Sequence, residues 1–115
     1  RNPTLESLDG LEGLRDLVGH LRIRENNVLN HIGGLIGLTR VGGSVTIFDN
    51  PSLVGLDGLR NLVSVGGTFT LRLNPALTWL DGLENLESLG GNLRIRENAN
   101  LPVSEIEKLV KRLGA

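Results

Sequence analysis

The chain has 115 residues, a formal net charge of −1 and no cysteine, and only 3% of its residues are aromatic. The length suits a single domain with an aliphatic core, and the nearly balanced charge excludes a general polyanion binder but not a local basic patch. Without cysteine there is no disulfide framework or thiol chemistry. The chain shows no targeting signal and no apolar run long enough to cross a bilayer, so we expect no direct membrane insertion.

Five asparagines stand exactly 24 residues apart, at Asn2, Asn26, Asn50, Asn74 and Asn98. A fixed period of this length is the sequence mark of a solenoid, in which each repeat forms one coil stacked on the last. The sequence therefore predicts a single solenoid domain over residues 1–115. Its four coils are expected at 2–25, 26–49, 50–73 and 74–97, followed by a C-terminal cap at 98–115.

Each coil contains the pattern G-x-L-x-I-x-x-N, for example Gly91–Asn98. Apolar residues at a spacing of two predict a short parallel strand whose alternate side chains point outward. Earlier in each coil the apolar spacing is three, as in Leu53, Leu56 and Leu59. That spacing also suits a short helix, but glycines such as Gly58 favour bends. We therefore predict three short extended sides per coil.

The asparagines are predicted to be structural, because a side-chain amide at the end of a strand can bond the backbone of a neighbouring coil. Most coils also carry an Asn-Pro or Asp-Gly turn, such as Asn50-Pro51 and Asp57-Gly58. The second coil has neither, with Asn26-Asn27 and Gly33-Gly34 in their place. We expect it to be the loosest coil.

After Asn98 the apolar residues recur at helical spacing: Val103, Ile106, Leu109, Val110 and Leu113. This pattern predicts an amphipathic helix that lies across the last coil and hides its leucines.

Trp79 is expected to pack against that helix, with an exposed contact residue as the alternative reading. No comparable cap precedes Asn2, so the first coil is expected to present an apolar edge that favours a homodimer through this uncapped coil.

The pattern L-x-x-L-D-G-L-x-x-L-x-x-V-G-G-x-L-x-I-x-x-N-P, seen in Leu53–Pro75, resembles the leucine-rich-repeat superfamily. Within it, the likeness is closest to receptor L domain repeats, found in the ectodomains of insulin- and EGF-type receptors. Related repeats occur in surface proteins of bacteria and fungi. The resemblance implies a right-handed leucine-rich β-helix and a non-catalytic recognition module, outside the cell or on its surface. Such modules act through the face of their parallel sheet.

The outward strand positions are the candidate binding residues, because packing in the core does not dictate them. They are His20, Arg22, Arg24, Thr46, Phe48, Thr70, Arg72, Arg94 and Arg96. Stacked strands lie about 4.8 Å apart, so these side chains are predicted to form one compact patch. One reading is a solvated face whose arginines are balanced by Glu25, Asp49 and Glu97. The other is a surface that recognises an anion or acid, with Phe48 as an apolar anchor.

No pattern indicates catalysis, a cofactor or a metal. His20 and His31 occupy different positions of the repeat, and the Asp-Gly turns lack the ligand spacing of a calcium loop. Nucleic acid as a partner would call for more exposed aromatics and a more basic domain. We therefore predict a non-enzymatic module that binds a protein or an acidic ligand. The alternative is a purely structural repeat scaffold, either a fragment of a larger surface protein or an engineered one.

Overall fold

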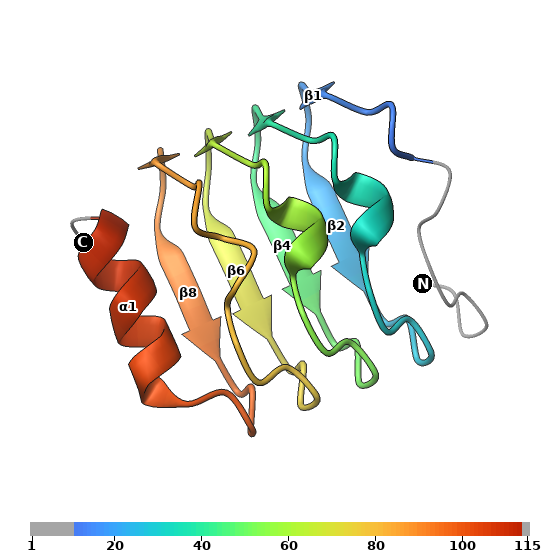
Figure 1. Cartoon of the computed structure of the whole chain (residues 1–115), viewed down its shortest axis with the longest axis vertical. Helices are drawn as coiled ribbons and strands as arrows, with labels where there is room; N and C mark the ends of the chain where they lie inside the picture. Colours follow the sequence, from blue (N-terminus) through green and yellow to red (C-terminus); the bar gives the residue numbers. More distant parts are fainter. Residues whose placement is uncertain (1–10, 114–115) are drawn as a thin grey trace.

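The structure, a computed structural model, describes residues 11–113. These residues form a β-solenoid of stacked parallel strands followed by one C-terminal helix (Figure 1). They comprise the coils predicted at 26–49, 50–73 and 74–97 and the later part of the coil at 2–25. The start of that first coil lies outside the described residues, and so does the prediction of a homodimer that depends on it.

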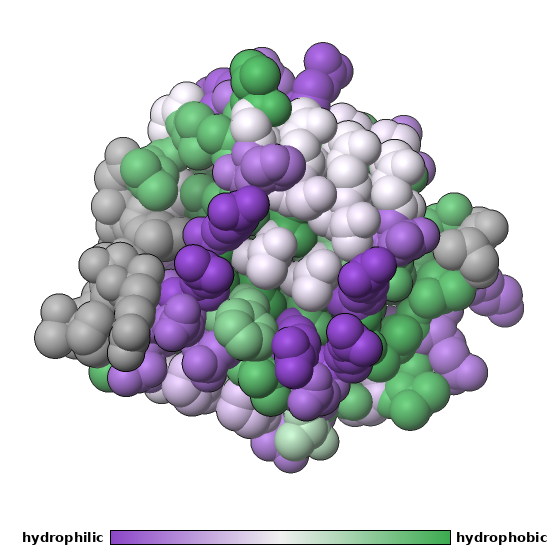
Figure 2. All heavy atoms as spheres, turned by 180° about the vertical axis from the view of Figure 1, so that it is seen from behind, coloured by the Kyte–Doolittle hydropathy of each residue, from purple (hydrophilic) through white to green (hydrophobic). Residues whose placement is uncertain are grey.

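Two parallel sheets run along the solenoid. The larger sheet consists of β2 (Leu21–Arg24), β4 (Val45–Phe48), β6 (Phe69–Arg72) and β8 (Leu93–Arg96). The smaller one consists of β1 (Asp16–Leu17), β3 (Arg40–Val41), β5 (Ser64–Val65) and β7 (Ser88–Leu89). Every strand pairs with its neighbour at an offset of 24 residues, as in Ile23 with Ile47 and Ile47 with Leu71. The 24-residue period predicted from the sequence is therefore the offset between paired residues in both sheets. The larger sheet turns its outer face toward the viewer in Figure 2.

The third side of the coil is not extended, so that expectation was wrong. In the second and third coils it is a 3₁₀ turn, η1 (Gly33–Leu35) and η2 (Asp57–Leu59). A 3₁₀ turn has three residues per turn, which matches the apolar spacing of three. Gly58 serves close stacking instead of a bend, because a Cβ there would lie 1.7 Å from the carbonyl oxygen of Ile32 on the preceding coil.

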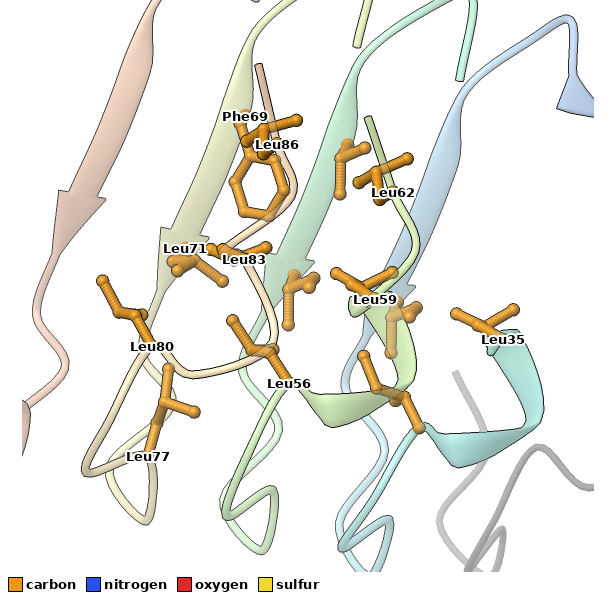
Figure 3. Close-up of a cluster of buried hydrophobic side chains, with 14 of the residues drawn as sticks. Leu35, Leu56, Leu59, Leu62, Phe69, Leu71, Leu77, Leu80, Leu83 and Leu86 are labelled. Atoms are coloured by element: carbon orange, nitrogen blue, oxygen red, sulfur yellow. The ribbon is translucent and has the colours of Figure 1, made fainter. Parts of the chain in front are cut away.

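The core is aliphatic apart from Phe69, and it lies between the larger sheet and the side of the coil that carries the 3₁₀ turns (Figure 3). In the close-up, Leu83 and Leu86 extend from that side of the coil and lie beside Leu71 and Phe69 of β6. The second coil is no looser than the third. Its inward residues Leu29, Ile32, Leu35 and Leu38 are at most 1% exposed, because its apolar side chains pack fully without the Asn-Pro and Asp-Gly turns.

The asparagine ladder is confirmed. The Asn50 Oδ1 accepts hydrogen bonds from the backbone N–H and the side-chain amide of Asn26, at 3.3 and 3.2 Å. Its Nδ2 donates to the Ile23 carbonyl at 3.0 Å. The same bonds recur one coil further on at Asn74 and two coils further on at Asn98. The residue before each buried asparagine has a positive φ, between 56° and 59°. This left-handed conformation directs the asparagine side chain toward the edge of the core.

The predicted C-terminal helix is present as α1 (Val103–Leu113). Leu109 is buried against the core, and Ile106 and Leu113 pack at its margin. Val103 does not belong to this apolar stripe, because it begins the helix and is 68% exposed. Among residues 11–113, no helix has the length and apolar character needed to span a membrane.

Trp79 does not pack against α1, contrary to the expectation. Its indole Nε1 lies 3.3 Å from the point where a Cβ on Gly55 would stand, so the ring leans over the preceding coil. The physical reason is the missing side chain at Gly55, which leaves space on that coil for the indole. The side chain remains 43% exposed.

Candidate functional site

The outer face of the larger sheet brings the predicted binding residues into two rows. Register places Arg22, Thr46, Thr70 and Arg94 side by side, and next to them Arg24, Phe48, Arg72 and Arg96. We call these eight residues the sheet face. The arginines on β2 and β8 are exposed, whereas the residues on β4 and β6 are half-buried because a strand flanks them on both sides. In Figure 2, pale and weakly polar residues cover one part of this side of the molecule, and strongly hydrophilic ones gather beside them.

His20 belongs to a third row that has a structural role. Its Nδ1 accepts a hydrogen bond from the Ser44 N–H at 2.8 Å. The Ser44 hydroxyl accepts from the Thr68 N–H at 3.0 Å, and the Thr68 hydroxyl accepts from the Asn92 N–H at 3.2 Å. Each side chain thus satisfies a backbone group of the next coil. Sequence reasoning missed this second ladder, although the signal was there: every member of the row can accept a hydrogen bond.

Arg72 is the arginine of the sheet face that contacts both an aromatic ring and a carboxylate. Its guanidinium carbon lies 5.4 Å from the centre of the Phe48 ring, within cation–π distance. Its Nε also forms an ion pair with the Glu97 carboxylate at 2.5 Å. Charge balance by a nearby carboxylate, expected for a solvated face, therefore applies to Arg72.

The other four arginines of the sheet face have no carboxylate within ion-pair distance among residues 11–113. They are Arg22, Arg24, Arg94 and Arg96. Unpaired guanidinium groups keep all their donors available, and a planar fork of donors matches a carboxylate or phosphate in a bidentate manner. The same part of the chain contains no cluster of three or more His, Cys, Asp or Glu side chains that could hold a metal ion.

Fold and surface together define a repeat protein of the β-solenoid class. Compared with protein-family models, with curated proteins and with solved structures, the chain matches none.

Proposed function

We propose that the chain is a non-catalytic recognition module of the leucine-rich, receptor L domain-like type, right-handed, that binds an acidic ligand or an acidic protein segment through the sheet face. The observation that supports this most directly is the set of unpaired arginines on β2 and β8. Long-range attraction by such a patch speeds and orients association with a partner of opposite charge. The resemblance to receptor L repeats adds a place of action outside the cell or on its surface.

The arrangement of the face suits an extended acidic segment that crosses the strands. Three inter-strand steps of about 4.8 Å put β2 and β8 roughly 14 Å apart. Arg22 and Arg94 therefore stand at opposite ends of one row, with Thr46 and Thr70 between them. The threonine hydroxyls can donate to or accept from a peptide backbone. Phe48 offers an apolar contact in the adjacent row.

A structural scaffold is the second candidate, and the row that starts at His20 favours it. The side chains of His20, Ser44 and Thr68 in that row accept hydrogen bonds from the next coil, so part of the outer surface serves stability and not recognition. The two candidates differ in what the arginines do, because a scaffold does not need them to be free.

Charge reversal separates the two candidates. One variant carries Arg22→Glu, Arg94→Glu and Arg96→Glu. Its matched control carries Arg40→Glu, Arg60→Glu and Lys111→Glu, three exposed cations elsewhere on the molecule. The probe is a fluorescent poly-glutamate peptide, titrated at low and at physiological salt. We expect the sheet-face variant to weaken binding at least about tenfold and to lose the salt dependence, and the control to change it little.

We expect melting curves to show that both variants remain folded, because exposed charges contribute little to stability. Failure of the unmodified protein to bind the peptide at low salt would remove the support for acidic recognition and favour the scaffold. Equal weakening by both variants would show that net charge, and not the sheet face, attracts the peptide.

A further inference from the structure

A cavity of about 270 Å³ lies at the corner of the coil that precedes the 3₁₀ turns, and it is separate from the sheet face. Three successive coils form it. His31, Gly55 and Trp79 stand at the same position of the repeat, 24 residues apart, so a residue without a side chain lies between two large ones. Gly55 is thus the floor of the cavity and the two rings are its walls. The repeat alone would not create this space; the change of residue type along one row does.

Trp79 supplies an aromatic surface that the core does not use. The indole leans over Gly55 and is 43% exposed, and it is the single tryptophan of the chain. Val54, 46% exposed, adds an aliphatic contact at the rim. A concave site with an aromatic wall and a few polar groups is the usual form of a small-ligand site.

Two polar side chains of opposite hydrogen-bonding character complete the lining. The His31 Nδ1 accepts a hydrogen bond from the Gly33 N–H at 3.4 Å, so the hydrogen of the neutral ring is on Nε2, which is a donor. Asp57, at the start of η2, is exposed, and its carboxylate forms no ion pair within residues 11–113. Both side chains line the cavity. A ligand there meets one donor, one acceptor and an indole.

We propose that this cavity binds one ring of a neutral saccharide. The C–H groups on one face of a pyranose ring can lie against the indole, and its hydroxyls can each donate to Asp57 and accept from His31. A simple cation would also suit Trp79 and Asp57, but it could not accept the hydrogen bond that His31 can donate. An anion would meet the Asp57 carboxylate. The mixed donor and acceptor set favours a neutral polyhydroxylated ring over both.

The single tryptophan makes the test direct, because all indole fluorescence comes from this cavity. The full chain is titrated with the methyl glycosides of glucose, galactose, mannose and N-acetylglucosamine, and with choline as a cationic probe. We expect a saturable change in Trp79 emission with at least one glycoside, at a dissociation constant on the order of 1 mM. Saturation-transfer NMR on the same glycosides detects binding that leaves the fluorescence unchanged.

The variants Asp57→Asn and His31→Ala remove the acceptor and the donor in turn. Each is expected to raise the dissociation constant roughly three- to tenfold. The matched control is Asp81→Asn, which changes the equivalent aspartate of the next coil, outside the cavity, and should have no effect. Absence of glycoside binding by both methods would overturn the proposal. So would equal weakening by the Asp81 variant, or saturation by choline alone, which would indicate a cation site.

Discussion

The third coil (50–73) and the fourth coil (74–97) share one apolar pattern but bury it to different degrees. In the third coil, which has a coil on either side, every inward side chain from Leu53 to Leu71 is at most 2% exposed. In the fourth coil the inward leucines Leu77, Leu80, Leu83 and Leu86 are at most 6% exposed, but Leu89, Leu93 and Ile95 are only partly buried. A neighbouring coil covers the whole cross-section, whereas α1 covers the half that lies opposite the strands. The prediction that the helix hides the last leucines is therefore right for that half and incomplete for the other.

On the side of the last coil that α1 covers, the helix makes hydrogen bonds that a following coil makes elsewhere in the solenoid. The carbonyl oxygens of Ile36 and Arg60 each accept from an asparagine of the next coil, Asn61 or Asn85, at 2.7 Å. The equivalent carbonyl in the last coil belongs to Glu84, and Arg112 of the helix donates to it at 2.6 Å.

Arg112 also donates to the carbonyls of Leu83 and Leu86, and the Glu105 carboxylate accepts from the Leu80 N–H at 2.9 Å. Buried polar groups of a terminal repeat need partners as much as its leucines need cover. The cap of this solenoid therefore has both an apolar and a polar part.

Deletion of residues 104–115 should have the largest effect on stability. It would expose the leucines between Leu77 and Leu86, at about 1.5–3 kcal/mol for each large side chain fully uncovered, and would leave the carbonyls bonded by Arg112 without their partner. The loss could rival the whole stability of a small domain, about 5–15 kcal/mol. Thermal melts and light scattering should show a much lower melting temperature or aggregation. Lys111→Ala, an exposed change in the same helix, serves as the control, and a soluble truncation of equal stability would show that α1 is not a cap.

Asn74→Ala should have an intermediate effect, because it interrupts the ladder between two coils. The Asn74 side chain accepts from Asn50 and donates to the Ile47 carbonyl, all in the core. Loss of these bonds should lower the free energy of unfolding by about 1–3 kcal/mol in urea melts. Asn85→Ala removes a single exposed bond and should cost less. Equal losses in the two variants would mean that the buried ladder contributes nothing beyond an ordinary surface bond.

The smallest effect concerns Glu105 and appears only in acid. Hydrogen bonding from Lys108, and then from the Leu80 N–H, holds the pKa of this carboxyl below its ordinary value of 4.5. The folded state thus favours the ionised form. Its contribution to stability is present above pH 4.5 and is lost as the pH falls below that value toward the folded-state pKa.

Glu105→Gln should therefore flatten the fall in unfolding free energy below pH 4.5, measured by urea melts at a series of pH values. Glu107→Gln, on an exposed position of the same helix, is the matched control. A slope unchanged by the first variant, or changed equally by both, would contradict a role for Glu105 in holding the helix to Leu80.

Much of the fold could be predicted because one period governs both the sequence and the register. A 24-residue offset aligns Ile23, Ile47 and Leu71 in the core and places the sheet-face residues in rows, with no knowledge of the path between strands. The buried ladder followed from the same offset, since an asparagine at a strand end meets its equivalent in the next coil. The helix followed from its own spacing of apolar residues.

Tertiary structure decided what depends on contacts between unlike residues. Spacing of three at Leu53, Leu56 and Leu59 fits both a bend and a 3₁₀ turn, and stacking of Gly58 on the Ile32 carbonyl accompanies the turn. Trp79 leans over Gly55 and does not pack against α1, because the glycine leaves room on the preceding coil. That room depends on a residue in another coil, so it cannot be predicted from Trp79 itself. The apolar spacing predicts the helix but not the carbonyl partners of Arg112, which depend on how the helix packs against the last coil. The repeat thus determined what every coil shares, and the packing of unlike neighbours determined where the coils differ.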